Sequence, residues 1–285
     1  MLARPKASAT FWKYDNWGAN PSSTIGTSVT PGASNVQGSW TQIASSANIA
    51  NEVVGFYLQV HAGATSTASK PQLMDIGIDP AGGTSYTAII SDMQIGASPA
   101  LTAAGAREHY FPMKIPSGAS VAARIRGANA TAGTVRVAAR FYGRPSNGLA
   151  LPCGTYSQTL GADTANSTGT SITPGNASDG GWVDLGTISR SLWWWQLGYV
   201  VANGTVTAEY TYLEVAYGDA SNKTSIFTVM HGGTTAETCG LAAQTQLLWP
   251  VAYCPVSAGT NIYVRGRCNN SPDTGYSVTV TGVGG

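Results

Sequence analysis

The side chains that most often carry enzyme chemistry are few and dispersed in this sequence. The three histidines are His61, His109 and His231, and none lies beside a motif for nucleophilic catalysis such as G-x-S-x-G. Asp75 and Asp79 come nearest to an acid–base pair. Residues four apart on a strand are separated by about 13 Å, more than the roughly 5–9.5 Å between glycosidase carboxylates. We therefore expect two solvated carboxylates facing outward, and we predict no catalytic residues and no enzyme activity.

The four cysteines do not have the spacing of a metal site. Cys153, Cys239, Cys254 and Cys268 include no C-x-x-C pair, and no histidine lies near two of them. Two alternatives remain open: a disulfide among the last three, or buried or free thiols. No Gly-rich phosphate loop and no calcium loop is present either, so the sequence predicts neither a metal nor another cofactor.

The composition favours an all-β protein with a weakly charged surface. Of the 285 residues, 43% are hydrophobic and only 10% are charged, against about 25% charged residues in an average soluble domain. The 35 glycines and 14 prolines are spread along the chain, which indicates many turns between short strands. Ser, Thr, Asn, Gln, Ala and Gly must therefore cover most of the surface.

The charge balance and the apolar runs exclude several classes of partner. The net charge is +1, which disfavours a strongly basic nucleic-acid binder. Residues 1–157 hold 11 Lys+Arg and 6 Asp+Glu (+5), and residues 158–285 hold 4 and 8 (−4). This asymmetry is typical either of two ends that meet different partners or of drift after duplication. No run reaches the about 18 apolar residues of a membrane helix, and the N-terminus resembles no secretory signal. We expect a soluble protein made in a cytoplasm.

The sequence contains an internal duplication, in which its second half resembles its first. GTSVTPG at 26–32 recurs as GTSITPG at 169–175, and ARIRGAN at 123–129 is matched by VRGRCNN at 264–270. Order and spacing are both kept, which indicates a tandem duplication. The predicted organisation is an N-terminal arm, a β-sandwich domain, a linker and a second β-sandwich domain, at residues 1–24, 25–145, 146–160 and 161–285.

Each copy shows eight apolar runs of period two, which predict eight strands. The expected strands of the first copy are 25–30, 38–44, 53–61, 73–79, 86–91, 109–115, 119–126 and 133–142. Those of the second are 168–173, 181–187, 193–202, 206–217, 224–231, 245–253, 260–267 and 275–283. Eight strands without an amphipathic helix favour a jelly-roll-like sandwich, and an immunoglobulin-like sandwich stays open.

Three consecutive tryptophans stand in the third strand of the second copy. Aligning the two third strands places Val54 opposite Trp195, on the face that is apolar in both copies. Because side chains alternate along a strand, Trp195 is predicted to lie in the core and Trp194 on the other face. Trp193 then lies at the edge of the strand. For the two surplus tryptophans we consider a protein interface (another subunit or the other domain), packing under a loop, or a platform for a sugar.

A pair of outward arginines recurs on the seventh strand of each copy. Either these arginines pair with Asp75 and Glu214 on the same sheet surface, or they contact an acidic neighbouring subunit. The four residues are Arg124 and Arg126 in the first copy, and Arg265 and Arg267 in the second.

The arm at 1–24 has no counterpart in the second copy and contains Phe11, Trp12, Tyr14 and Trp17. A free tail is seldom so aromatic, so we expect it to lie across a neighbouring molecule or across its own second domain. The predicted interface residues are Trp12, Trp17, Trp193, Trp194, Arg124, Arg126, Arg265 and Arg267.

These features together resemble the jelly-roll virion proteins of tailed bacteriophages, of the decoration (cement), head-fibre, and neck or tail accessory types. The resemblance rests on the Met start without a signal, the aromatic arm, the low charge, and the duplicated sandwiches, of which the first ends in VRVAARFYG. The resemblance implies a non-enzymatic virion protein that binds the outside of a particle and stabilises it. Its partners would be the major capsid protein or other virion proteins, with copies forming a trimer or ring, and neither nucleic acid nor membrane. The alternative is a neck or tail accessory or receptor-binding, lectin-like protein that binds a host-surface glycan.

Overall fold

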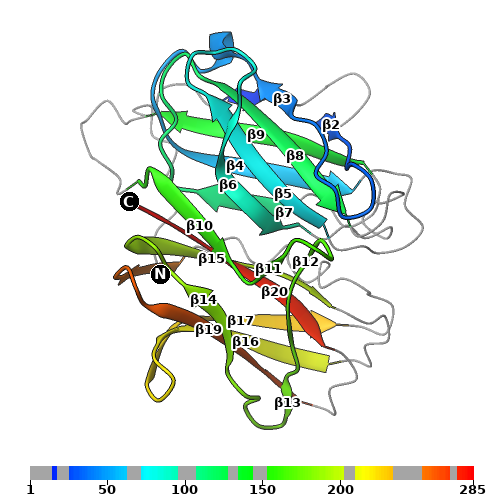
Figure 1. Ribbon diagram of the computed structural model, residues 1–285, viewed down its shortest axis with the longest axis vertical. Coiled ribbons are helices and arrows are strands. Elements are labelled where there is room, and N and C mark those ends of the chain that lie inside the picture. The colour runs from blue at the N-terminus through cyan, green and yellow to red at the C-terminus, as the bar shows by residue number, and fades with distance from the viewer. Residues whose placement is uncertain are drawn as a thin grey trace.

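The computed structural model describes residues 15–17, 26–62, 72–95, 107–127, 134–143, 153–201, 209–233, 252–269 and 275–285. Within these ranges the chain is all-β except for the 3-10 helix η1 (Ser46–Asn48), and no helix there is long and apolar enough to cross a membrane. Four sheets form two β-sandwiches, one above the other in Figure 1. The fold class predicted from the sequence is therefore confirmed.

The first sandwich has the strand order of a jelly roll. One sheet runs β1-β9-β4-β7, with β2 also pairing with β9, and the facing sheet runs β3-β8-β5-β6. Strands from the start and the end of the domain thus alternate within each sheet, as in two interleaved Greek keys. The strands are β1 (Asp15–Trp17), β2 (Thr27–Val29), β3 (Thr41–Ala44), β4 (Val53–Ala62), β5 (Gln72–Asp79), β6 (Thr87–Gln94), β7 (Arg107–Phe111), β8 (Ser120–Gly127) and β9 (Val135–Gly143).

The second sandwich repeats this order. One sheet runs β11-β12-β20-β15-β18, with β10 also pairing with β20, and the other runs β13-β19-β16-β17, with β14 also pairing with β19. Its strands are β10 (Tyr156–Leu160), β11 (Ala162–Asp163), β12 (Thr168–Ile172), β13 (Gly175–Asn176), β14 (Val183–Thr187), β15 (Leu192–Val201), β16 (Glu209–Gly218), β17 (Lys223–Gly233), β18 (Ala252–Val256), β19 (Asn261–Cys268) and β20 (Tyr276–Gly284).

The strand registers correct the alignment of the two copies. Val53 faces Gly143, the last residue of β9, and Leu192 faces Gly284, the last residue of β20. Val53 therefore corresponds to Leu192, and Phe56 rather than Val54 corresponds to Trp195. The predicted alignment was wrong by two residues, but an even shift keeps every side chain on its face. The predicted core position of Trp195 was unaffected for that reason.

Irregularities of the strands also recur in both copies. The register shifts between Val53 and Gly55, and between Leu192 and Trp194. A second pair of shifts lies in β3, before Ala44, and in β14, before Gly186. β-Bulges are specific features of a strand that re-aim its side chains, so their repetition supports the tandem duplication independently of the sequence motifs.

Each sandwich has its own hydrophobic core, and one sheet serves both. Phe56 is fully buried in the first core and Trp195 in the second. All nine residues of β20 are buried, because one face of this strand lines the second core while the other lies against the first sandwich. Val283 of β20 belongs to the core cluster of the first sandwich.

The arm and the linker differ from their predicted forms. Residues 15–17 of the arm form β1, which pairs with β9 of its own first domain; a path across the second domain is wrong for this part. β10, at 156–160, pairs with β20 in the corresponding way, so the arm does have a counterpart in the second copy. The predicted linker at 146–160 likewise includes a strand of the second sandwich at its end.

Candidate interaction surfaces

A stacked arginine lies on the outer face of the first sandwich. Asp75 and Arg124 are direct neighbours on β5 and β8, and Nε and Nη2 of Arg124 each lie 2.8 Å from Oδ2 of Asp75. The guanidinium also lies 4.3 Å from the ring centre of Trp40. Gly77 leaves room for this indole, because a Cβ there would lie 2.7 Å from the Trp40 ring.

The second sandwich builds the same arrangement from corresponding residues. Arg265 on β19 lies 4.3 Å from the ring centre of Trp182 and bonds Glu214 on β16 through Nε and Nη2, both at 2.7 Å. Asp179 adds a third contact at 2.9 Å from Nη1. Arg124 and Arg265 are thus held by acids of their own sheets, which is the first of the two interpretations drawn from the sequence.

The expectation of solvated carboxylates at Asp75 and Asp79 is wrong. Both are buried. Asp79 accepts hydrogen bonds from the backbone N–H groups of Ala81 (2.9 Å) and Ser85 (2.8 Å). Asp75 is covered by Arg124 and Gln37. Alternation along β5 correctly placed both carboxylates on the outer face. The side chains that cover Asp75 come from distant segments, whereas Asp79 is covered by the turn that directly follows it.

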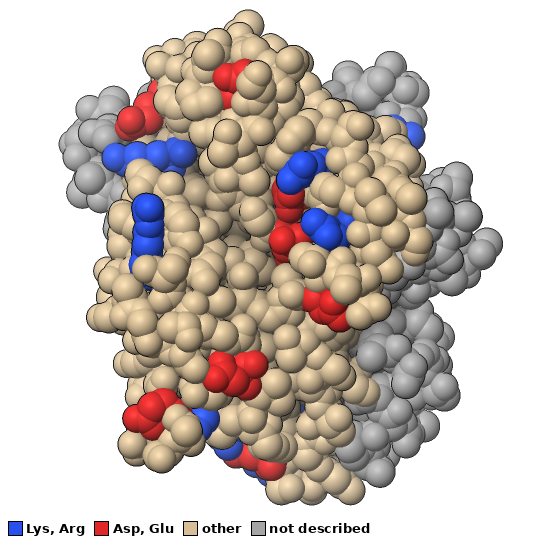
Figure 2. Space-filling model, in the orientation of Figure 1, with Lys and Arg blue, Asp and Glu red and all other residues tan. Residues whose placement is uncertain are grey.

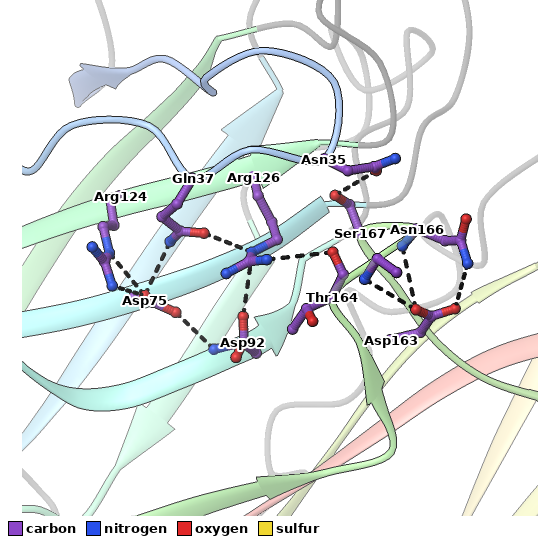
Figure 3. A network of polar contacts seen from close by, with 11 residues as sticks. Asn35, Gln37, Asp75, Asp92, Arg124, Arg126, Asp163, Thr164, Asn166 and Ser167 are labelled. Atoms are coloured by element: carbon purple, nitrogen blue, oxygen red, sulfur yellow. Dashed lines mark hydrogen bonds and ion pairs between the residues drawn. The ribbon is translucent and has the colours of Figure 1, made fainter.

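Arg126 connects the two sandwiches (Figure 3). Its Nε donates to Oε1 of Gln37 at 2.7 Å and lies 3.5 Å from Oδ1 of Asp92, while Nη1 donates to the carbonyl of Thr164 in the second sandwich at 3.3 Å. Close by, Ser167 of the second sandwich donates to Asn35 of the first at 2.8 Å. The turn between β11 and β12 is therefore bonded to the first sandwich.

Asp92 lies in this network in an unusual backbone conformation. Its φ is 52°, in the left-handed region, and its N–H donates to Oδ1 of Asp75 at 2.8 Å. Burial raises the pKa of Asp92 above its ordinary value, and the negative charge of Asp75 raises it further, while Arg126 and Arg124 oppose the shift. The seam between the sandwiches therefore contains a carboxyl group that ionises less readily than an aspartate in water.

A second set of polar contacts joins β6 to the sheet of β20. The Gln94 side-chain amide donates to Oγ of Ser277 at 3.0 Å, and the Gln94 N–H donates to Oγ1 of Thr279 at 3.3 Å. Gly198 permits this close approach, since a Cβ there would lie 2.9 Å from the carbonyl oxygen of Gln94. The edge of the first sandwich is therefore closed by the outer face of the second.

The three tryptophans have three different environments. Trp195 is fully buried in the second core, and its indole N–H donates to the Cys254 carbonyl at 2.8 Å. Trp194 packs against the core cluster of the first sandwich and makes an edge contact with Tyr253. Trp193 is half-buried and lies at the bulge of β15. Trp194 thus lies in a contact between the two domains of one chain.

Three tyrosines that no sequence pattern singled out form a cluster on the outer face of the β1-β9-β4-β7 sheet. The ring centres of Tyr57 and Tyr110 are 4.7 Å apart, and Tyr142 packs edge-on against both. Burial, and then the two neighbouring phenols, raise the pKa of Tyr110. Their outward parity was readable from the sequence, but their meeting depends on the order of β7, β4 and β9 in the sheet.

The remaining predicted residues are placed as follows. Arg267 on β19 is exposed, Trp17 lies in β1 opposite Ala139, and Trp12 lies outside the described residues. Cys268 is a buried thiol that donates to the carbonyl of Gly175, and Cys254 is not in a disulfide. Cys239 lies outside the described ranges, within which no cluster of three metal-binding side chains occurs.

The charged groups on the face seen in Figure 2 are sparse, and several basic groups there lie beside acidic ones. This matches the low charge content of the sequence. The polar groups that the sequence singled out are, in the described residues, largely engaged inside the molecule, and apolar side chains are left at its surface. Among the residues that the structure describes, the exposed large hydrophobic ones are Val36, Tyr212, Met230 and Tyr253.

No protein-family model and no curated protein matches the sequence. Among solved structures, PNGF-II has a TM-score of 0.39 at 7% identity over 95% of this chain and 65% of that chain, so this chain spans less than two thirds of PNGF-II. The STIV MCP has a TM-score of 0.38 at 10% identity, over 95% of this chain and 96% of that one. PNGase F, a glycosylasparaginase from Flavobacterium meningosepticum, has a TM-score of 0.33 at 10% identity over 95% and 96%. At 7–10% identity, these likenesses concern the fold alone.

Proposed function

We propose that this chain is a non-enzymatic structural protein of a phage virion, which binds the outside of the particle as a capsid decoration protein and stabilises it. The observation that carries the proposal is the joint between the sandwiches. A residue of the last strand, Val283, belongs to the core of the first domain, and the Arg126 and Gln94 contacts bond the two domains to each other. Two sandwiches joined by a shared core residue and by hydrogen bonds form one rigid unit. Such a unit suits a protein that must transmit force between neighbouring subunits.

The roles of the conspicuous side chains support a structural rather than a catalytic function. Asp75 and Glu214 are bonded to arginines, and Asp79 is bonded to backbone N–H groups. These acids stabilise the outer faces of the sheets and do not face one another. The alternative of a sugar platform at Trp194 has no comparable support, because its indole packs against the first core.

The test is the amount of this protein in purified virus particles, measured by quantitative mass spectrometry against the major capsid protein. A copy number comparable with that of the major capsid protein is the expected result for a decoration protein. A few copies per particle would instead assign the protein to the neck, tail or receptor-binding apparatus. Its absence from particles would contradict the proposal as a whole.

A further inference from the structure

One row of residues on the first sandwich forms much of its contact with the second. Leu73 on β5 lies opposite Gln94 on β6 and opposite Arg126 on β8. We call these three residues the docking row. Gln94 bonds Ser277, Arg126 bonds Thr164, and Leu73 and Gln94 are 0% exposed.

The second sandwich carries the corresponding row at its surface. Tyr212 on β16 lies opposite Met230 on β17 and opposite Arg267 on β19. Asp75 and Glu214 are the next outward residues along β5 and β16 and face Arg124 and Arg265, so Leu73 corresponds to Tyr212. We call these three residues the exposed row. Met230 is 54% exposed and Tyr212 is 47% exposed.

The composition of the exposed row is unusual for a solvated edge. In a chain whose surface is mostly small and polar, a thioether and a phenol lie side by side at the rim of a sheet. Adjacent exposed apolar groups mark contact sites, and methionine and tyrosine favour protein interfaces. The position that is polar in the docking row, Gln94, has become apolar in the exposed row, as Met230.

We propose that the exposed row of one copy docks on the first sandwich of a second copy, head to tail. Inside the chain, Gln94 of the docking row lies against the outer face of the sheet that holds β20, and Arg126 bonds the turn between β11 and β12. The corresponding surface of a second copy is the outer face of the β1-β9-β4-β7 sheet, where Tyr57, Tyr110 and Tyr142 form their cluster. The contact between copies would thus repeat the contact within the chain.

Charge and size are consistent with this choice of partner. The two halves carry net charges of +5 and −4, so a head-to-tail contact brings halves of opposite net charge together, whereas a tail-to-tail contact brings together two halves of the same net charge. Gln59 stands where the second sandwich has Gly198, since both lie three residues after the corresponding pair Phe56 and Trp195. The side chain of Gln59 prevents a docked strand from approaching this face as closely as Gln94 approaches Gly198. Tyr212 is larger than Leu73 and fills the wider gap.

The proposal concerns contacts between copies and needs no particle, so its test is separate from that of the proposed function. The edge variant combines Tyr212→Ser with Met230→Ser, and the face variant combines Tyr57→Ser with Tyr142→Ser. The matched control is Val36→Ser, an exposed apolar residue of the first sandwich outside both surfaces. Circular dichroism and urea unfolding verify that each variant folds. If the double edge variant does not fold, Met230→Ser alone replaces it as the edge variant.

Sedimentation velocity over a range of concentrations then measures self-association. We expect the full chain and the Val36→Ser control to associate, and each double variant to raise the Kd at least about tenfold. A mixture of the two variants should regain a one-to-one complex, since one keeps an intact face and the other an intact edge. A wild-type chain that stays monomeric, or an edge variant that associates normally, would overturn the proposal. So would a mixture that does not associate, which would indicate a symmetric contact.

Discussion

Arg124 holds Asp75 through two nitrogen atoms, Nε and Nη2, each 2.8 Å from the same carboxylate oxygen. The side chain of Asp75 is only 4% exposed, whereas that of Glu214, its counterpart beside Arg265, is 23% exposed. The two copies therefore offer the same ion pair at two depths of burial.

Removing the arginine should cost more in the first copy than in the second. Arg124→Gln leaves a buried carboxylate without its cation, which costs about 3 kcal/mol in the free energy of unfolding. Arg265→Gln leaves a more solvated carboxylate and should cost about 1 kcal/mol. Urea denaturation of the two variants measures the difference. Equal losses would show that burial does not set the strength of this pair.

Asp92→Asn should stabilise the protein at neutral pH. The pKa of Asp92 is raised in the folded state, so the folded protein binds a proton more readily than the unfolded chain, and stability falls as pH rises above the unfolded pKa of about 4. Asparagine carries no charge and tolerates the left-handed conformation of this residue. The gain should be present at pH 7 and disappear below the unfolded pKa. Urea midpoints measured against pH test this, and a gain that persists in acid would contradict it.

The hydrogen bond between Gln94 and Ser277 should couple the two sandwiches. Ser277 also accepts a bond from the N–H of Gly169 at 2.6 Å, so the single variant Ser277→Ala reports more than one contact. A double-mutant cycle with Gln94→Ala isolates the pair, and we expect a coupling of about 1 kcal/mol. A coupling of zero would mean that the bond adds nothing to the joint.

Alanine substitutions of the neighbouring Trp194 and Trp195 should distinguish the stability contributed by core packing from that contributed by the contact between domains. Trp195→Ala opens a cavity in the second core and removes the bond to Cys254, which should cost about 4 kcal/mol. Trp194→Ala removes a partly buried contact with the first core and should cost about 1.5 kcal/mol. Calorimetry of both variants is the measurement. If the cost of Trp194→Ala matched that of Trp195→Ala, Trp194 would be a core residue rather than a contact between domains.

The sequence predicted the strands and their faces because period-two alternation is a local signal. The first copy's expected strand at 73–79 is β5 at 72–79, and Phe56 and Trp195 lie in their cores as alternation requires. The expected strand at 245–253 overlaps β18 only at its end, at 252–253, and residues 245–251 lie outside the described ranges. Turn residues thus located most strands to within a few positions.

What the sequence could not supply was the partner of each outward side chain. Asp75 has the parity of an exposed residue, and nothing local reveals that Arg124 and Gln37 cover it. Trp194 also has outward parity, and its burial depends on a second sandwich lying against the first. Alternation indicates which face of the sheet a residue occupies, but long-range packing decides whether that face is exposed to solvent.

β20 also has a consequence for the order in which the chain can fold during synthesis. The first sandwich leaves the ribosome well before residue 283, yet Val283 belongs to its core cluster. Until that strand emerges, Gln94 at the β6 edge lacks its partners Ser277 and Thr279. The nascent first domain therefore has an incompletely packed edge until β20 is synthesised. A stop codon or a stall upstream of β20 should leave both domains, rather than one, open to proteolysis.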